Sequence, residues 1–127
     1  MAYSPLQKYQ QSSVQTASRG QLIIMLYDGA IRFVKLGIEG IAERNIAKAN
    51  INLQKAQTIL HELVASLDFT YPISKNLLSI YEYMIYRLIQ SNIKKELSFA
   101  EEVLNHLTEL RDTWHVALKQ GPKTSES

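Results

Sequence analysis

The residues in this sequence best suited to bind a metal or transfer a proton are three histidines, His61, His106 and His115. A di-iron centre in a helical bundle needs a carboxylate-x-x-His motif on each of two helices, together with two further glutamates. Asp112 and His115 have this spacing, but the sequence contains no second copy of the motif. Glu102 and His106 lie one helical turn apart, as many solvent-exposed pairs do. We therefore expect no metal site and no cofactor.

The sequence also lacks the motifs of nucleophilic and phosphate chemistry. It contains no nucleophile elbow, no P-loop and no dinucleotide-binding glycine motif. We expect that the protein is not an enzyme, and that its function depends on the helices described next.

Charge and hydropathy exclude two further classes of protein. The 127 residues include 14 Lys and Arg and 12 Asp and Glu, scattered so that they form no basic patch, and we expect no nucleic-acid partner. No uninterrupted apolar stretch approaches the roughly 20 residues of a membrane span, so we expect no membrane insertion. The N-terminal residues lack the features of a secretory signal, and there is no cysteine. These observations predict a cytoplasmic domain.

The first long helix is predicted to begin after Ser18 and to run to about Arg44. Ser18 and Gln21 have the spacing of a capping box, in which each side chain accepts a hydrogen bond from a free backbone N–H. The apolar residues that follow form two stripes, centred roughly 150° apart around the helix axis. The first stripe contains Leu22, Leu26, Gly29, Phe33, Leu36 and Gly40. The second contains Ile24, Tyr27, Ile31, Val34, Ile38 and Ile41.

Two interpretations of these stripes remain open. A helix that is apolar nearly all round is usually buried in a core, which would make this the central helix of the fold. Alternatively, one stripe packs within the bundle and the second stripe accepts another protein chain.

Two more helices follow in the middle of the chain. Asn45 is a suitable cap for the second helix, which has one apolar stripe between residues 46 and 67. This stripe contains Ile46, Ala49, Leu53, Ala56, Leu60, Leu63 and Leu67. The third helix begins with Pro72 in its first turn, or with Ser74 as its cap, and ends near Asn92.

The last helix completes the predicted fold. Ser98 and Glu101 have the spacing of a second capping box, and Gly121 followed by Pro122 ends the helix. Its stripe contains Ala100, Val103, Leu107, Leu110, Trp114 and Ala117. No segment alternates with a period of two, so we expect no sheet. We predict an all-α, antiparallel four-helix bundle over residues 18–120, with a short, loosely held N-terminal segment (1–17) and a disordered tail (121–127).

Residues spread over nearly the whole chain resemble one family in order. They are Val14, Thr16-Ala17-Ser18, the run Met25 to Ala30, Phe33, Asn52-Leu53, Lys55-Ala56, Asn76-Leu77, Tyr81 to Met84, Asn92 and Arg111 to Trp114. In this pattern the chain resembles the FliS family, the bacterial flagellin-specific export chaperones. It departs from the family at Arg19, where Pro is frequent, and at Tyr71-Pro72, where a Gly-containing loop is common.

The resemblance implies a function for the predicted bundle. It implies a cytosolic chaperone of type III flagellar export that binds the disordered C-terminal segment of flagellin. Such binding would prevent premature polymerisation and keep flagellin competent for export. The resemblance also implies export-gate components and a co-chaperone as candidate partners.

Apolar residues that the bundle core least needs are the predicted client-binding residues. They come from the second stripe of the first helix and from positions off the main stripes of the next two helices. They are Ile24, Tyr27, Ile31, Val34, Ile38, Ile51, Ile59, Tyr83 and Tyr86.

The N-terminal segment has two interpretations. Its composition is that of a solvated tail. The resemblance instead implies a lid, in which Leu6 and Tyr9, three residues apart, cover the client-binding surface.

A different class of function also fits the second stripe. The chain could be a self-associating structural bundle without a dedicated client, in which two copies bury the same stripe.

Overall fold

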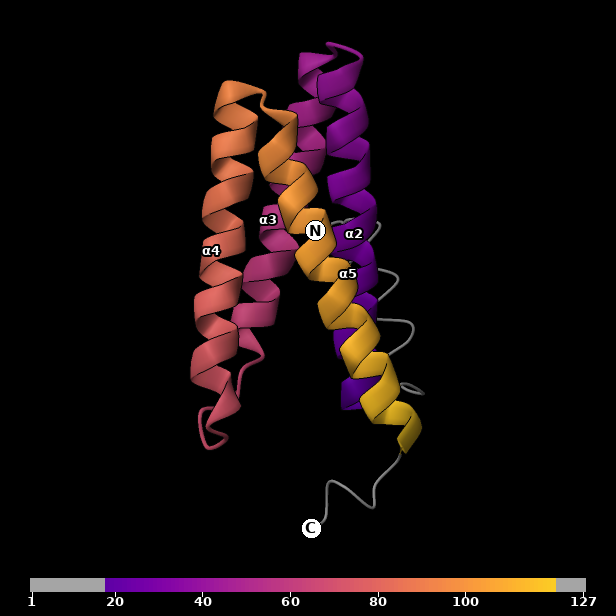
Figure 1. Cartoon of the computed structure of the whole chain (residues 1–127), viewed down its shortest axis with the longest axis vertical. Coiled ribbons are helices and arrows are strands. Elements are labelled where there is room, and N and C mark those ends of the chain that lie inside the picture. The colour runs from indigo at the N-terminus through magenta and orange to yellow at the C-terminus, as the bar shows by residue number, and fades with distance from the viewer. Residues whose placement is uncertain (1–17, 121–127) are drawn as a thin grey trace, which may run out of the picture.

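The computed structural model describes residues 18–120 and contains four helices in this part of the chain. They are α2 (Arg19–Ala42), α3 (Ile46–Ala65), α4 (Ile73–Lys94) and α5 (Leu97–Gln120). Successive helices run antiparallel and are joined by short turns (Figure 1). No strand occurs within residues 18–120. The predicted all-α four-helix bundle is confirmed, whereas the predictions for segments 1–17 and 121–127 lie outside the described residues.

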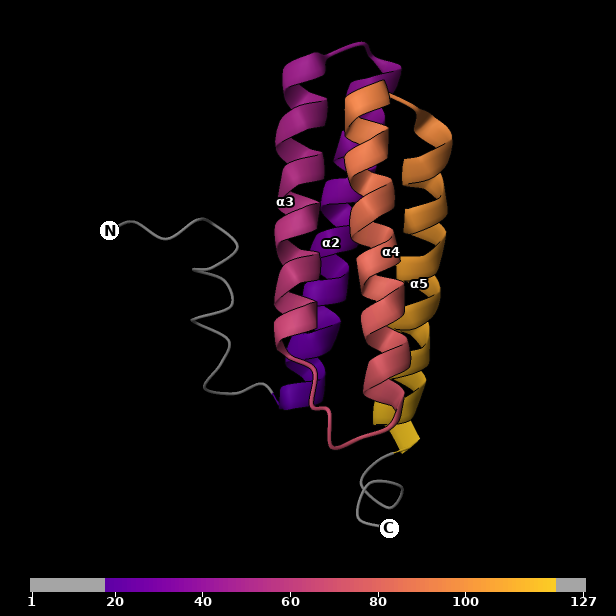
Figure 2. The ribbon, with the colours of Figure 1, turned by 90° about the vertical axis from the view of Figure 1, so that its left-hand side faces the viewer.

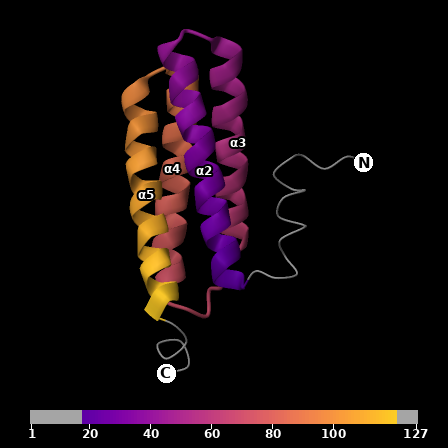
Figure 3. The same ribbon diagram turned by 90° about the vertical axis from the view of Figure 1, so that its right-hand side faces the viewer.

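The helices form a ring in which each one contacts two neighbours. α2 packs against α3 and α5, and α4 packs against the same two helices. Figure 2 shows α4 in front of α2, and Figure 3, from the opposite side, shows α2 lying between α5 and α3. α2 and α4 are therefore diagonal partners, and α2 has a helix on each side.

The first two helix starts agree with the sequence prediction. At the start of α2, the Ser18 hydroxyl accepts from the Gln21 N–H and the Gln21 side chain accepts from the Ser18 N–H, which completes the capping box. At the start of α3, the Asn45 side chain accepts from the Lys48 N–H. Each contact satisfies a backbone donor that the helix cannot satisfy itself.

The other two helix starts differ from the prediction. α4 begins at Ile73, and the Ser74 hydroxyl donates to the Asp68 carbonyl instead of capping the helix. α5 begins at Leu97, before the Ser98 that was expected to cap it. The reason is a tighter turn between α4 and α5, in which Lys95 adopts a left-handed conformation (φ 52°) and lets α4 continue to Lys94.

Both apolar stripes of α2 are covered within the bundle. The first stripe faces α3, since a Cβ added to Gly40 would lie only 2.5 Å from the backbone nitrogen of Ala49. Gly20 lies one helical turn before Ile24 and therefore on the same face of α2 as the second stripe. A Cβ added to Gly20 would meet the Leu118 side chain, so this face is directed toward α5. The central-helix interpretation is therefore confirmed. The expectation that the second stripe lies uncovered is wrong, because each stripe packs toward its own neighbouring helix.

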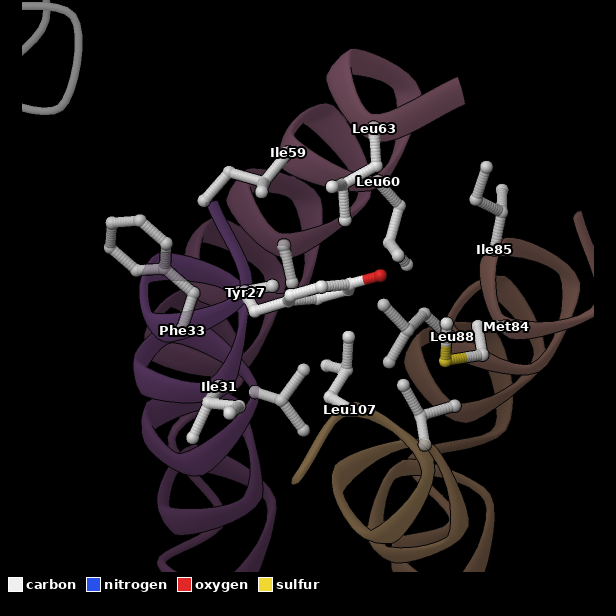
Figure 4. Close-up of a cluster of buried hydrophobic side chains, with 14 of the residues drawn as sticks. Tyr27, Ile31, Phe33, Ile59, Leu60, Leu63, Met84, Ile85, Leu88 and Leu107 are labelled. Atoms are coloured by element: carbon white, nitrogen blue, oxygen red, sulfur yellow. The ribbon is translucent and has the colours of Figure 1, made fainter. Parts of the chain in front are cut away.

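The centre of the core contains a hydrogen bond between the two diagonal helices. Tyr27 of α2 reaches across the bundle among apolar side chains of the other three helices (Figure 4). Its hydroxyl lies 2.5 Å from the hydroxyl of Tyr81 of α4, and both rings are buried. Burial is the main reason why the pKa of each tyrosine is raised above its ordinary value.

Candidate functional site

The nine residues predicted to bind a client fall into two groups. The first group is buried or packs against the core and contains Ile24, Tyr27, Ile31, Val34, Ile38 and Ile59. The second group is exposed and contains Ile51, Tyr83 and Tyr86. The first group is not accessible to a client in this structure, because its side chains are buried or pack against the core. The predicted lid residues Leu6 and Tyr9 lie outside the described residues.

A groove of about 580 Å³ lies between α4 and α5. Ile80 and Tyr83 of α4 and Leu110 of α5 give it apolar walls. Ser79, Glu102, His106, Glu109 and Thr113 supply polar atoms around them. An elongated groove of mixed walls between two helices is the kind of surface that accepts an amphipathic helix.

The groove exists because α4 and α5 are joined tightly only at one end. Glu102 accepts hydrogen bonds from the Tyr83 hydroxyl (2.6 Å) and from Arg87 Nε (2.9 Å). The Arg87 guanidinium also lies over the Phe99 ring, and the Tyr83 ring meets His106 edge-on. Among residues 18–120, every hydrogen bond, ion pair and ring contact found between these two helices involves Phe99, Glu102 or His106. Away from the turn that joins them, the two helices diverge (Figure 1).

The charge of Glu102 is stabilised by these contacts. The hydrogen bonds from Tyr83 and Arg87 lower the pKa of the Glu102 carboxyl. Because the Tyr83 hydroxyl donates to this carboxylate, its own pKa is raised. Glu102 therefore stays ionised and holds α4 to α5 at this end of the groove.

Burial along α5 shows how far the bundle closes. Ala100, Val103 and Leu107 are fully buried, whereas Leu110 and Trp114 of the same stripe are half-buried. The apolar stripe thus continues past the point where α4 covers it. Uncovered apolar surface next to a groove is typical of an interaction site.

The sequence prediction found one residue of this groove, Tyr83, and missed the others. The seven lining residues that were not among the predicted client-binding residues are Ser79, Ile80, Glu102, His106, Glu109, Leu110 and Thr113. A signal for Ile80 was available, since it lies off the core-facing positions of its helix as Tyr83 does. Leu110 carries no such signal, because it belongs to the regular stripe and is uncovered only by the divergence of the helices.

The sequence that forms this bundle and its α4–α5 groove matches a known protein family. A sequence model of the family described as "Flagellar protein FliS" matches residues 2–121. The chain belongs to the FliS family. The matched residues include all four described helices and therefore both walls of the groove.

Three relatives support this assignment. The flagellar secretion chaperone FliS of Bacillus subtilis is 38% identical over 120 residues, which cover 94% of this chain and 90% of the relative. The Escherichia coli protein of the same name is 32% identical, over 85% of this chain and 82% of its own length. The Salmonella typhimurium protein of that name is 34% identical, over 82% of this chain and 79% of its own length.

Within residues 18–120, no group of three or more His, Cys, Asp or Glu side chains is placed to hold a metal ion. None of the described helices is long and apolar enough to cross a bilayer.

Proposed function

We propose that this FliS-family chain is a cytoplasmic export chaperone that binds the C-terminal segment of flagellin. The observation that carries this proposal is the open groove between α4 and α5, with apolar side chains on both walls. By covering the client segment, the chaperone would prevent premature polymerisation and keep flagellin competent for export. Export-gate components and a co-chaperone are further proposed partners.

The dimensions of the groove suit a short helix. Along α5 it extends from Glu102 to Thr113, eleven positions apart. At a rise of about 1.5 Å per residue this is roughly 16 Å, or three turns of a helix. A client helix of this length can place apolar residues at i, i+3 or i+4, and i+7 against Ile80, Tyr83 and Leu110.

The remaining exposed predicted residues extend the proposed surface. Tyr83 lines the groove, while Ile51 of α3 and Tyr86 of α4 lie outside it. A client longer than one helix would contact them by wrapping around the bundle. For Leu6 and Tyr9, we propose docking in the same groove when no client is present.

Binding would be coupled to folding of the client. Apolar burial drives association, and ordering a disordered client typically costs about 2–5 kcal/mol of the interaction energy. The heat-capacity change should therefore be negative and helicity should rise on mixing.

Calorimetry and circular dichroism with a synthetic peptide of the flagellin C-terminal segment test the function. We expect one-to-one binding with a gain of helix beyond the sum of the two spectra. Absence of binding at tens of micromolar, by a chaperone that melts cooperatively, would contradict the client assignment.

One feature favours self-association as a second candidate function. The outer face of α4 presents three exposed side chains at helical spacing, Tyr86, Ile89 and Ile93. A second copy could cover this stripe. Sedimentation over a hundredfold concentration range would detect such a dimer, and a monomer throughout would exclude it.

A further inference from the structure

We propose that Glu109 makes the α4–α5 groove selective for a client helix that carries Lys or Arg beside its apolar anchors. This inference rests on the proposed function, because it concerns the chemistry of the client in the same groove. Its basis is the distribution of paired and unpaired charge around the groove.

The two carboxylates that line the groove are in different states. Glu102 is already neutralised locally, since Arg87 Nε lies 2.9 Å from it and Tyr83 donates to it at 2.6 Å. Glu109 is exposed, and within residues 18–120 it takes part in no hydrogen bond or ion pair. No Lys or Arg side chain lines the groove. The groove therefore offers one uncompensated negative charge.

The position of Glu109 relates this charge to the apolar walls. On α5, Glu102, His106, Glu109 and Thr113 recur at steps of four, three and four residues, so they lie along one face. Leu110 is adjacent to Glu109, and Ile80 lines the opposite wall. A helix whose apolar residues contact Ile80 and Leu110 must pass beside the Glu109 carboxylate.

The nature of the passing residue decides the free energy of this contact. A Lys or Arg on the client pairs with Glu109 at the rim of the groove. A neutral residue removes water from the carboxylate without replacing it, which is unfavourable. An acidic residue adds repulsion between like charges. The same side chain thus favours a basic client and disfavours neutral and acidic ones.

The inferred selectivity has a kinetic signature. Rim charges act mainly on the association rate and on the salt dependence of binding. Because the Debye length falls to about 3 Å at 1 M salt, the contribution of Glu109 should disappear there.

A double-mutant cycle tests the inference. The flagellin C-terminal peptide is titrated in its natural form and with its Lys and Arg residues changed to Gln. Each peptide is titrated against the parent protein, Glu109→Gln and the control Glu101→Gln, at low salt and at 1 M salt. Glu101 is exposed on the same helix but does not line the groove.

We expect Glu109→Gln to weaken binding of the natural peptide about three- to tenfold at low salt and hardly at all at 1 M salt. Neutralising the peptide should weaken its binding to the parent and leave its binding to Glu109→Gln nearly unchanged. Glu101→Gln should bind as the parent does, and all three proteins should melt alike.

Three results would overturn the inference. If Glu109→Gln binds the natural peptide as tightly as the parent, the charge of Glu109 does not select the client, and the proposed function stands. If Glu101→Gln weakens binding equally, the overall negative charge of α5 attracts the client and Glu109 has no specific role. If the parent does not bind the natural peptide at all, the inference and the proposed function both fail.

Discussion

The α2–α3 pair and the α4–α5 pair are both antiparallel, but different residues bring their helices together. In α2, Gly37 and Gly40 let α3 approach so closely that an added Cβ would overlap Leu53 or the backbone of Ala49. Neither α4 nor α5 contains a glycine. Their facing residues include Tyr83 and Phe99, and they are joined at one end by Glu102.

This difference explains why α2 and α3 approach closely at Gly37 and Gly40, whereas α4 and α5 leave the larger groove between them. Small side chains let two helix backbones come together along their length, and dispersion contacts then fill the interface. Large aromatic and charged side chains hold helices apart, and contact is restored only where they pair specifically. Of these two pairs, the one without glycine leaves the groove of about 580 Å³.

The largest expected effect comes from placing a charge in the core beside α2 and, for comparison, in the wall of the α4–α5 groove. Ile31→Lys puts an ammonium group into the core cluster and should cost roughly 3 kcal/mol or more in unfolding free energy. Ile80→Lys, in the wall of the groove, leaves the charge in water and should change stability by about 1 kcal/mol or less. Urea unfolding of both variants checks this. Equal losses would mean that the groove wall is core as well.

The glycine contacts can be tested with a matched pair of substitutions. Gly40→Ala forces a backbone shift at Ala49 and should destabilise the protein by about 1–3 kcal/mol. Gly20→Ala meets only the end of the Leu118 side chain, which can move, so the higher helix propensity of alanine should make it neutral or stabilising by up to about 1 kcal/mol. Thermal unfolding distinguishes the two. A stabilising Gly40→Ala would contradict the close α2–α3 approach.

The tyrosine pair across the diagonal tests whether the core depends on a polar contact. Tyr27→Phe leaves the buried Tyr81 hydroxyl without its partner and should cost about 1–2 kcal/mol. The double variant Tyr27→Phe, Tyr81→Phe removes both hydroxyls and should cost less than the sum of the single changes. Additive losses in unfolding free energy would show that the two hydroxyls act independently.

The smallest expected effect is a pH dependence of the α4–α5 junction. The folded-state pKa of Glu102 is lowered by the Tyr83 and Arg87 hydrogen bonds, so the ionised form favours folding. This stabilisation is complete above the unfolded pKa of about 4.3 and is lost as the pH falls through the lower folded value. Glu102→Gln should therefore lower stability by about 1 kcal/mol or less at neutral pH and by nothing in strong acid, because the side chain is partly exposed. A loss that persists in acid would contradict the role of its charge.

Much of the fold could be predicted from local sequence signals. The capping residues Ser18 and Asn45 and the regular apolar stripes specify four helices, because caps and periodicity depend only on neighbouring residues. The α4–α5 turn was harder to predict, since the left-handed conformation of Lys95 has no sequence signature such as glycine.

The candidate site could be predicted only in part. Periodicity gives the direction of a stripe around its own helix axis, but it does not identify the helix that covers it. Ile31 and Tyr83 were therefore grouped together, although α5 covers the first and the second lines an open groove. The open surface at Leu110 depends on the divergence of two helices, a tertiary property that no local pattern encodes.

The most direct test of the groove as the client-binding site compares two lysine substitutions on α4. Ile80 lines the groove, and Ile93 is 77% exposed on the outer stripe of the same helix. The flagellin C-terminal peptide is titrated calorimetrically against Ile80→Lys, Ile93→Lys and the parent protein. We predict that Ile80→Lys weakens binding at least tenfold, because the buried lysine would lose its water, while Ile93→Lys binds as the parent does. Unchanged binding by Ile80→Lys together with weakened binding by Ile93→Lys would place the client on the outer face of α4 and contradict the groove.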